Sequence, residues 1–441
     1  MIFSLDVRRA RKGDCLLLHF GSKDEPGLVM IDGGPSGVYA PHLKPRLKQI
    51  RAARGLRQEE PLGVDLLMIS HVDDDHIRGI LDLTKELLAD QAAHRPLALQ
   101  VFDFWHNSFD SIIGNKPDAL TAAFKGHFGA ASTGGGLPSD ATIEADDEDL
   151  DEETIVTSLK VLASIEQGSR LRSDARRLEF PANLEFGGKL IMATKDAEPL
   201  EIAPGLSFTV AGPMLPELEK LHKKHEAWLK DLKKKGKSPP DALAAYVDQS
   251  VANLSSLVVL AEAAGKRMLL TGDARGDKIL EGLELVGALK KGDTMHVELL
   301  KVPHHGSANN LDDDFFERIT ADHYVFSGDG EHGNPEREAL QMLLDARGDA
   351  DYRIHLTYPI GEVDVAREDD WKKEQAKEKK RKKKNPNKEL RADWSPQKHS
   401  IADFLAKHPE LADKVRVVDA DKPHVIDLAE PLGDSWPSLA S

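Results

Sequence analysis

The segment from Ser70 to His76 constrains this chain more than any other feature. It reads Ser-His-Val-Asp-Asp-Asp-His and follows an apolar run, 65–70, that predicts a buried strand. Five potential metal ligands thus fall within six residues, and their carboxylates would raise one another's pKa without a nearby cation. A divalent ion removes that conflict, and histidine with carboxylate suits zinc, manganese or iron. The alternative is a polar loop that caps the following helix, with Asp75 as the N-cap residue.

Two later segments repeat the arrangement of an apolar strand followed by potential ligands. In one, Asp273 follows the run 269–272, although strand-Gly-Asp alone also occurs at ordinary turns. In the other, the adjacent histidines His304 and His305 follow the run 299–302, where a single histidine would more often be structural. All three segments place ligands in the exit loop of a strand, which is where α/β folds place their chemistry.

Charge and cysteine content narrow the function classes. The formal net charge of −16 argues against a chain that binds nucleic acid over its whole surface, so a polyanionic substrate would be held locally, by metal ions or a basic patch. The single cysteine, Cys15, excludes an intramolecular disulfide, and its apolar neighbours predict a buried thiol. No run approaches the roughly 18 apolar residues of a membrane span. We therefore expect a cytoplasmic protein that does not contact a membrane.

The apolar pattern weakens in the middle of the chain. Residues 1–106 and 250–362 are predicted to be two halves of one hydrolase domain. Residues 107–249 are predicted to be an insertion between them. Its acidic block, 140–153, is typical of a solvated loop, and 215–235 has the spacing of an amphipathic packing helix.

Residues 363–441 are predicted to be a charged C-terminal extension. Within it, Lys372 to Arg391 hold 11 Lys and Arg against 3 Glu. This segment resembles a charged tail or linker; the alternative is a basic surface that follows a nucleic-acid backbone. Further along, 401–407 has a helical pattern and 414–418 a strand-like one.

Together these motifs resemble the metallo-β-lactamase superfamily, and within it the ComEC-like hydrolases. The matches lie in 1–106 and 250–340, about half of the chain. The membrane channel of ComEC proteins is absent, so DNA uptake is not implied. In chain order, the matching segments are Gly13 to Leu18 (G-D-C and an apolar run), Leu28 to Gly33 (a strand ending in I-D-G), Ser70 to Gly79 (S-H-x-D-x-D-H-x-x-G), Asn253 to Val259 (N-x-x-S-L-V), Leu269 to Asp273 (L-L-T-G-D), Leu300 to Ser307 (L-K-x-P-H-H-G-S) and Ser327 to Pro335 (ending in H-G-N-P).

The resemblance implies an α/β fold, the αββα four-layer sandwich, here with a large insertion and a charged C-terminal extension. It implies two divalent metal ions, zinc or manganese, at one edge of the sheets. His71 and Asp73 would hold one ion; the commoner superfamily motif has histidine at position 73, but aspartate there is usual in ComEC-like members. The superfamily's additional single histidine has no clear match, and His106 is the candidate, with a hydrogen-bonded loop histidine as the alternative.

The second ion would be held by Asp75, His76 and one of the adjacent histidines, His305 or His304. Asp273 would bridge the two ions. Asp75 is thus both a metal ligand and a catalytic candidate. By this resemblance the nucleophile would be a hydroxide generated on the metal ions, whose coordination lowers the pKa of water toward about 7.

Further residues would support that chemistry. Asp32 would hold a ligand in place by contacting it from behind. His304, His332 and Asn334 could stabilise developing charge or protonate the leaving group. The first functional hypothesis is accordingly a phosphodiesterase, most simply a nuclease.

Two other classes stay open. One is a hydrolase of small substrates, such as a cyclic nucleotide, a phosphoester, a lactone or an amide. The other is a non-catalytic module that kept the fold and acts with a partner in a defence-type complex. The complete ligand set argues against the latter.

Overall fold

Two β-sheets pack face to face and form the centre of the molecule. The computed structural model describes residues 1–107, 167–219, 255–312, 314–384, 386–387, 389–419 and 422–432. Apolar side chains from both sheets, among them Phe3, Phe208 and Met268, are fully buried in the layer between them. Because each sheet turns one apolar face toward the other, their burial is a main stabilising contribution.

The first sheet has six strands in the order β16-β1-β2-β3-β5-β7. Its neighbours are antiparallel from β16 to β3 and parallel from β3 to β7. Its strands are β1 (Ile2–Val7), β2 (Leu16–Gly21), β3 (Pro26–Ile31), β5 (Leu66–Met68), β7 (Phe104–Trp105) and β16 (His424–Asp427).

The second sheet has eight strands in the order β15-β14-β13-β12-β11-β10-β9-β8. The pairs from β15 to β11 are parallel and those from β11 to β8 antiparallel. Its strands are β8 (Leu200–Ala203), β9 (Leu206–Gly212), β10 (Val258–Ala263), β11 (Lys266–Leu270), β12 (Met295–Lys301), β13 (Ile319–Phe326), β14 (Arg353–Leu356) and β15 (Val415–Val417). A separate parallel pair joins β4 (Leu62–Val64) and β6 (Leu99–Val101).

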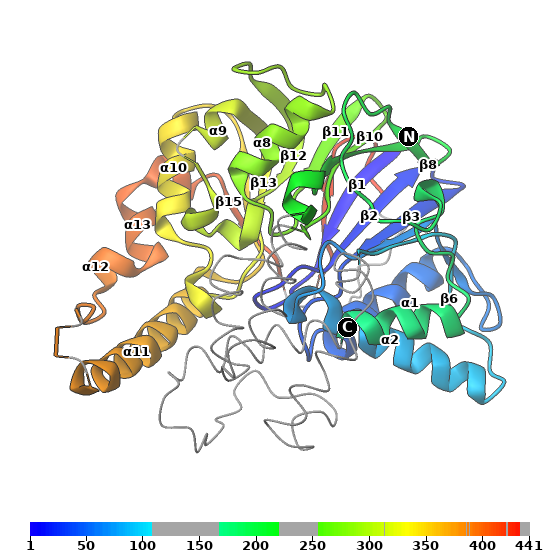
Figure 1. The fold of residues 1–441 in the computed structure, drawn as a ribbon, viewed down its shortest axis with the longest axis horizontal. Helices are drawn as coiled ribbons and strands as arrows, with labels where there is room; N and C mark the ends of the chain where they lie inside the picture. The colour runs from blue at the N-terminus through cyan, green and yellow to red at the C-terminus, as the bar shows by residue number, and fades with distance from the viewer. Residues whose placement is uncertain are drawn as a thin grey trace, which may run out of the picture.

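Helices cover the outer face of each sheet, which completes the four layers (Figure 1). Apolar faces of α1 (Lys44–Ala53) and α2 (Asp74–Ala92) pack on the first sheet. On the second sheet pack α8 (Gly276–Leu285), α9 (Phe315–Arg318), α10 (Arg337–Arg347) and α13 (Ile401–Lys407). The predicted αββα sandwich is therefore confirmed. The remaining helical elements are α11 (Ile360–Lys384), α12 (Pro396–His399), α14 (Pro409–Ala412), the π-helical turn η1 (Tyr39–Leu43), and the 3-10 turns η3 (Leu184–Phe186), η5 (Pro303–Gly306), η6 (Ala308–Asn310) and η7 (Glu331–Gly333).

Two glycines let α2 approach the loop after β3 without an intervening side chain. Gly33 donates its N–H to His76 O at 2.8 Å, and Gly79 donates to Gly34 O at 2.9 Å. A Cβ on Gly79 would lie only 1.9 Å from Gly33 O, so the two backbones are in direct contact. This contact fixes the first turn of α2, which carries Asp75 and His76, against the sheet edge.

The sandwich draws on more of the chain than the sequence predicted. Residues 200–212 lie in the predicted insertion, 107–249, yet they form β8 and β9 of the second sheet. The predicted extension, 363–441, supplies β15 to one sheet and β16 to the other. β8, β15 and β16 lie at sheet edges. β9, β15 and β16 pair with strands far away along the chain, so no local pattern marks them as part of the domain. The acidic block 140–153 and most of 215–235 lie outside the described residues; 215–219 are helical, as predicted.

The basic segment is a helix over most of its length, where the sequence predicted a tail or linker. It continues α11 as far as Lys384, because lysine, arginine and glutamate favour helices. Ion pairs one turn apart add support, such as Lys372–Glu368 at 2.7 Å. The chain then returns along the helix, where Gln375 Nε2 donates to Arg391 O and Trp371 Nε1 to Ala392 O. Further along, the helix at 401–407 and the strand within 414–418 are confirmed. Among the described helices, none combines the length and apolarity needed to cross a membrane.

Candidate metal centre

The exit loops of four strands meet at one edge of the sandwich. Asp32 follows β3, His71 follows β5, Asp273 follows β11, and the pair His304 and His305 follows β12. Backbone hydrogen bonds tie these loops together: Gly33 N donates to His76 O at 2.8 Å, and His304 N donates to Gly272 O at 3.1 Å. The three predicted ligand segments are thus brought into one place.

An unusual backbone conformation sets the direction of several of these side chains. Asp32, His304 and His305 have φ angles of 57°, 46° and 56°, in the left-handed region. For residues with a Cβ, this conformation costs on the order of 1–3 kcal/mol each, and such costs cluster at functional sites. The strain here coincides with the loops that carry the candidate ligands.

The Asp273 carboxylate lies between two pairs of imidazole rings. Its Oδ1 is 3.4 Å from His76 Nε2 and 3.3 Å from His305 Nε2. Its Oδ2 is 3.7 Å from His71 Nε2 and 3.6 Å from His304 Nε2. Each carboxylate oxygen therefore faces its own pair of ring nitrogens.

These atoms fit metal ligation better than hydrogen bonding. The Nε2 atoms of His71, His76 and His305, and Oδ1 of Asp273, are buried and have no hydrogen-bond partner. Such atoms carry a substantial cost unless something else satisfies them. Ligand atoms about 2.0–2.1 Å from a tetrahedral zinc ion stand about 3.3 Å apart, close to the spacings seen here. The chemistry and spacing of the donor set therefore fit divalent ions.

Two groups of potential ligands arise from this arrangement. One contains His71, Asp75 and His76; the other contains His76, Asp273, His305 and Asp14. Because His76 belongs to both, the groups are adjacent and together make up one centre.

Hydrogen bonds behind the rings hold them in place. Asp32 Oδ2 lies 2.8 Å from His76 Nδ1, in the position expected for a carboxylate that steadies a ligand. Ser70 donates its N–H to Asp32 Oδ1 at 2.7 Å, and its hydroxyl to Oδ2. On the other side, His305 Nδ1 lies 2.9 Å from Ser327 Oγ, and that hydroxyl donates to Asp14. These contacts leave the Nε2 atoms directed toward Asp273.

Burial and neighbouring charges shift the pKa values of the histidine rings in opposite directions. Burial, with a contribution from His76, lowers the pKa of His71 to about 3, so this ring is neutral. Burial alone would also lower the pKa of His76, but Asp273 and Asp32 raise it well above its usual value. Burial raises the pKa of the Asp273 carboxyl, yet His305 and His76 hold it well below its usual range. In the metal-free protein a proton on His76 thus balances the carboxylates.

Metal binding is expected to release a proton from His76. The raised pKa keeps this ring protonated near pH 7, and a metal ion and a proton compete for the same nitrogen. Metal affinity should therefore rise with pH until the pH passes that raised pKa, and then level off. Calorimetric titration with zinc in two buffers of different ionisation enthalpy would measure the release, at about one proton per chain. An identical observed heat in both buffers would rule it out.

Other predicted residues lie at the rim or apart from the centre. Asp73 Oδ2 is 3.8 Å from His71 Nε2, and its side chain is 31% exposed. His304, at 29% exposed, lies on the open side as well. The buried Asn334 has an unpartnered Oδ1 and places its Nδ2 3.5 Å from His304 O. His332 is exposed, with Lys12 Nζ 3.4 Å from its Nε2.

His106 belongs to neither ligand group among the described residues. Its ring stacks on Phe104, with centroids 5.5 Å apart, and its backbone exchanges hydrogen bonds with the Asn183 side chain. The ligand assignment of His106 and the loop-histidine alternative both stay predictions. The capping alternative for Asp75 fails: α2 begins at Asp74, its N-cap residue is Asp73, and no side-chain cap bond forms.

Asp14 and Lys301 also lie at the centre, although the sequence did not mark them as candidates. Both are buried and charged: Lys301 ends β12 after Leu300, and Asp14 lies in the loop before β2, next to Cys15. A buried charge among apolar residues is seldom tolerated without a partner. A charged residue beside apolar ones in the sequence could therefore have marked these two positions. Cys15 itself is buried as predicted, and burial raises the pKa of its thiol to about 12.

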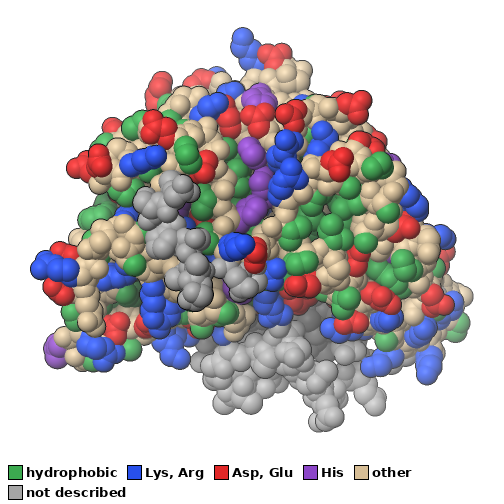
Figure 2. All heavy atoms as spheres, turned by 180° about the vertical axis from the view of Figure 1, so that it is seen from behind, with side chains coloured by type: hydrophobic (Ala, Val, Ile, Leu, Met, Phe, Trp, Pro, Cys, Tyr) green, Lys and Arg blue, Asp and Glu red, His purple; other side chains and the backbone are tan. Residues whose placement is uncertain are grey.

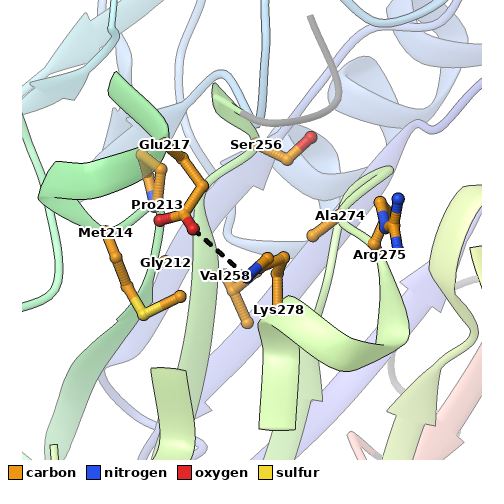
Figure 3. A pocket seen from close by; sticks show the side chains of 9 residues that line it. All are labelled: Gly212, Pro213, Met214, Glu217, Ser256, Val258, Ala274, Arg275 and Lys278. Carbon is orange, nitrogen blue, oxygen red and sulfur yellow. Dashed lines mark ion pairs between the residues drawn. The ribbon is translucent and has the colours of Figure 1, made fainter. Parts of the chain in front are cut away.

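A small pocket lies beside the centre (Figure 3). Ser256 on its wall accepts the Asp273 N–H at 3.3 Å, and Lys278 faces Glu217 across it at 3.5 Å. The cavity measures about 20 Å³, room for about one water molecule, so a whole substrate would have to lie elsewhere. Its lining residues are Gly212, Pro213, Met214, Glu217, Ser256, Val258, Ala274, Arg275 and Lys278.

Comparison of the sequence with models of known protein families identifies the class to which this fold and site belong. The model for the metallo-beta-lactamase superfamily matches residues 9–245, more than half of the chain. The chain therefore belongs to the metallo-β-lactamase superfamily. The match includes the segment from Ser70 to His76 and ends before Asp273.

More distant similarities concern parts of other proteins. Microtubule-associated protein 1A of Rattus norvegicus is 30% identical over 136 residues, which are 30% of this chain and 5% of that protein. Its counterpart in Mus musculus is 34% identical over 97 residues, or 19% of this chain and 4% of that protein. The chain thus spans about a twentieth of these relatives. A crystal structure from Parabacteroides distasonis, described as a metal-dependent hydrolase, aligns over 79% of this chain and 97% of its own at 10% identity and a TM-score of 0.29, which supports no conclusion.

Proposed function

We propose that this protein is a metal-dependent hydrolase that cleaves phosphodiester bonds at a dinuclear centre, with nucleic acid as the substrate class. The observation that carries the proposal is the Asp273 carboxylate, whose two oxygens each face a separate pair of histidines. A carboxylate in that position can bridge two ions. When bound, two divalent ions supply a nucleophile at neutral pH and neutralise charge on a phosphoryl group.

Buried residues of the chain would hold the metal ions, and more exposed residues would contact the substrate. The buried rings of His71, His76 and His305, with Asp75 and Asp273, would hold the ions and keep bulk water away from them. At the exposed rim, Asp73 would complete the ligands of the ion beside His71, and His304 would meet the substrate. His304 is placed to give a proton to the leaving oxygen, and Asn334 Nδ2 beside it could hydrogen-bond a phosphoryl oxygen.

Turnover of defined substrates tests this proposal. The purified protein, reconstituted with zinc or manganese, would be assayed against single-stranded DNA, duplex DNA, RNA and bis-p-nitrophenyl phosphate. Cleavage of a nucleic acid and of the small diester is the expected result. Cleavage of lactones or amides alone would replace the proposal with the small-substrate hydrolase, and no turnover in any assay would favour the non-catalytic module.

The basic half of α11 is the proposed contact for the nucleic-acid backbone. On the face that Figure 2 shows, basic and acidic side chains are interspersed. On α11, by contrast, residues 379–384 are all lysine or arginine. The N-terminal half of this helix packs on η7, and Arg367 donates hydrogen bonds to Gly333 O and Pro335 O. The helix is thereby attached to the loop that carries His332 and Asn334.

Replacing Lys380 and Lys382 by alanine should weaken nucleic-acid binding and flatten its salt dependence. Each lost phosphate contact removes about 0.7–0.9 from the slope of log K against log salt, so the pair should remove about 1–2. The matched control replaces the exposed Lys290 and Lys291, which lie beyond α8, and should leave the slope unchanged. Equal slopes in wild type and both variants would leave α11 as a solvated helix. Substitution is preferable to deletion of 372–391, which would also remove the contacts of Gln375 with the returning chain.

Metal preference is expected to depend on Asp73. Carboxylate is a harder ligand than imidazole and suits manganese better, whereas zinc binds more tightly in general. We expect manganese to support at least as much phosphodiesterase activity as zinc, and Asp73→His to shift the preference toward zinc. The measurement is turnover of bis-p-nitrophenyl phosphate after chelation and reconstitution with each ion. Activity with zinc alone in both proteins would show that residue 73 does not set the preference.

A non-catalytic binding module is the second candidate. The relatives that match part of this chain are named for association with microtubules, not for hydrolysis. The complete set of buried metal-binding side chains supports catalysis over this alternative, because a module without chemistry has no need of it.

A further inference from the structure

A buried lysine lies at the metal centre. Lys301, the last residue of β12, is 1% exposed. Its Nζ lies 2.5 Å from Asp14 Oδ2 and donates to Gly272 O at 3.1 Å. The same ammonium is 3.9 Å from Asp273 Oδ1, the oxygen that faces His76 and His305. An amino group thus stands 3.9 Å from a carboxylate proposed to bind metal ions.

Asp14 contacts the two histidine rings from behind. Its Oδ1 is 3.6 Å from His305 Nδ1, and its Oδ2 is 3.9 Å from His76 Nδ1. The Nε2 atoms of the same rings point to Asp273 instead. Asp14 also accepts a hydrogen bond from Ser327, the hydroxyl that holds His305 Nδ1. Although its distances alone would group Asp14 with the ligands, its contacts are those of a residue that orients them.

We propose that Asp14 and Lys301 form an internal ion pair whose charges offset each other beside His76, His305 and Asp273, so that a divalent cation can enter the site, and that Asp14 does not itself ligate the metal. A lone ammonium at this distance would oppose the entry of a divalent cation, because charges repel strongly in a dry site. Asp14 offsets that charge. Lys301 also donates to Gly272 O, in the turn before Asp273. The inference rests on the proposed metal centre.

A cycle of three variants tests the pair by metal affinity, measured by competition with a chromophoric chelator for zinc. Asp14→Asn leaves the Lys301 charge uncompensated beside the incoming cation, and should weaken zinc binding by about 10–100-fold, the range usual for residues just behind metal ligands. Lys301→Met removes the positive charge instead, and should not cause a 10–100-fold loss of zinc affinity. The double variant Asp14→Asn/Lys301→Met removes both charges and should bind within about tenfold of wild type.

Asp6→Asn is the matched control. Asp6 is also buried and paired, at 2.6 Å from Arg46 Nε, but it lies outside both ligand groups. Breaking either pair destabilises the fold, because it leaves a charge buried alone. The control should therefore lower the thermal midpoint and leave zinc affinity unchanged.

The double variant decides the question even if a single variant does not fold, since replacing both charges of a buried pair is often neutral for stability. Zinc affinity near wild type would support the pair. Affinity reduced 10–100-fold or more in the double variant would identify Asp14 as a ligand and overturn the inference, as would unchanged affinity in Asp14→Asn. Absence of zinc binding in the wild type would instead refute the proposed metal centre.

Discussion

Replacing Asp75 or His76 by alanine should remove bound metal and abolish hydrolysis while the fold persists. His76 belongs to both ligand groups, and Asp75 joins it in one of them. Losing a group that only orients a ligand costs about 10–100-fold, so losing a ligand should reduce activity by more than about 100-fold. The measurements are metal content by mass spectrometry, turnover of bis-p-nitrophenyl phosphate, and circular dichroism for the fold.

Asp74→Ala is the control for these two variants. Asp74 lies in the same helical turn, but its Oδ1 accepts a hydrogen bond from Gln167 and lies 3.8 Å from Arg78 Nε, outside both ligand groups. It should keep its metal and most of its activity. Wild-type metal content in Asp75→Ala and His76→Ala would contradict the site. Metal loss in Asp74→Ala would show that the ligands are assigned to the wrong carboxylate.

Replacing Gly79 by alanine should destabilise the fold and displace the metal-binding turn. The new Cβ would meet Gly33 O at 1.9 Å, far inside contact distance, so α2 and the loop after β3 must separate. Overpacking of this kind costs about 1–3 kcal/mol or more. The two hydrogen bonds that join these segments, from Gly33 to His76 O and from Gly79 to Gly34 O, would be strained as well. Denaturant unfolding would measure the loss of stability.

Gly361→Ala is the comparison for that variant. Gly361 also lies in a helix, α11, and its added Cβ would meet no atom within 4 Å. Alanine there should stabilise the protein by up to about 1 kcal/mol, because glycine is a poor helix residue. Equal stability of Gly79→Ala and wild type would mean that α2 is not fixed by close backbone contact.

The sequence predicts the main candidate ligands because each of them comes soon after an apolar strand. Ser70 to His76, Asp273 and the pair His304–His305 each come directly after an apolar strand, and all three segments meet at one edge. What the sequence could not supply is orientation. Which carboxylate oxygen faces which ring, and that Asp14 approaches the rings from behind, depend on packing between residues hundreds of positions apart.

The differences between prediction and structure have separate physical causes. His106 follows a strand as the other candidate ligands do, but it joins neither ligand group among the described residues; its backbone is hydrogen-bonded to Asn183 and its ring stacks on Phe104. The short edge strand β16 has a weak local pattern, and its pairing with the distant strand β1 defines it. The basic segment was taken for a linker because of its charge, although the same lysines and glutamates favour a helix.

The most direct test of the account is the number of metal ions that the protein binds. The full chain would be stripped with chelator, dialysed against zinc or manganese, freed of excess metal, and analysed by mass spectrometry together with Asp273→Asn. Because each oxygen of Asp273 faces its own pair of histidines, we predict about two ions per chain in the wild type and a clear loss in the variant. A wild-type protein that retains no ion with either metal would contradict the central claim.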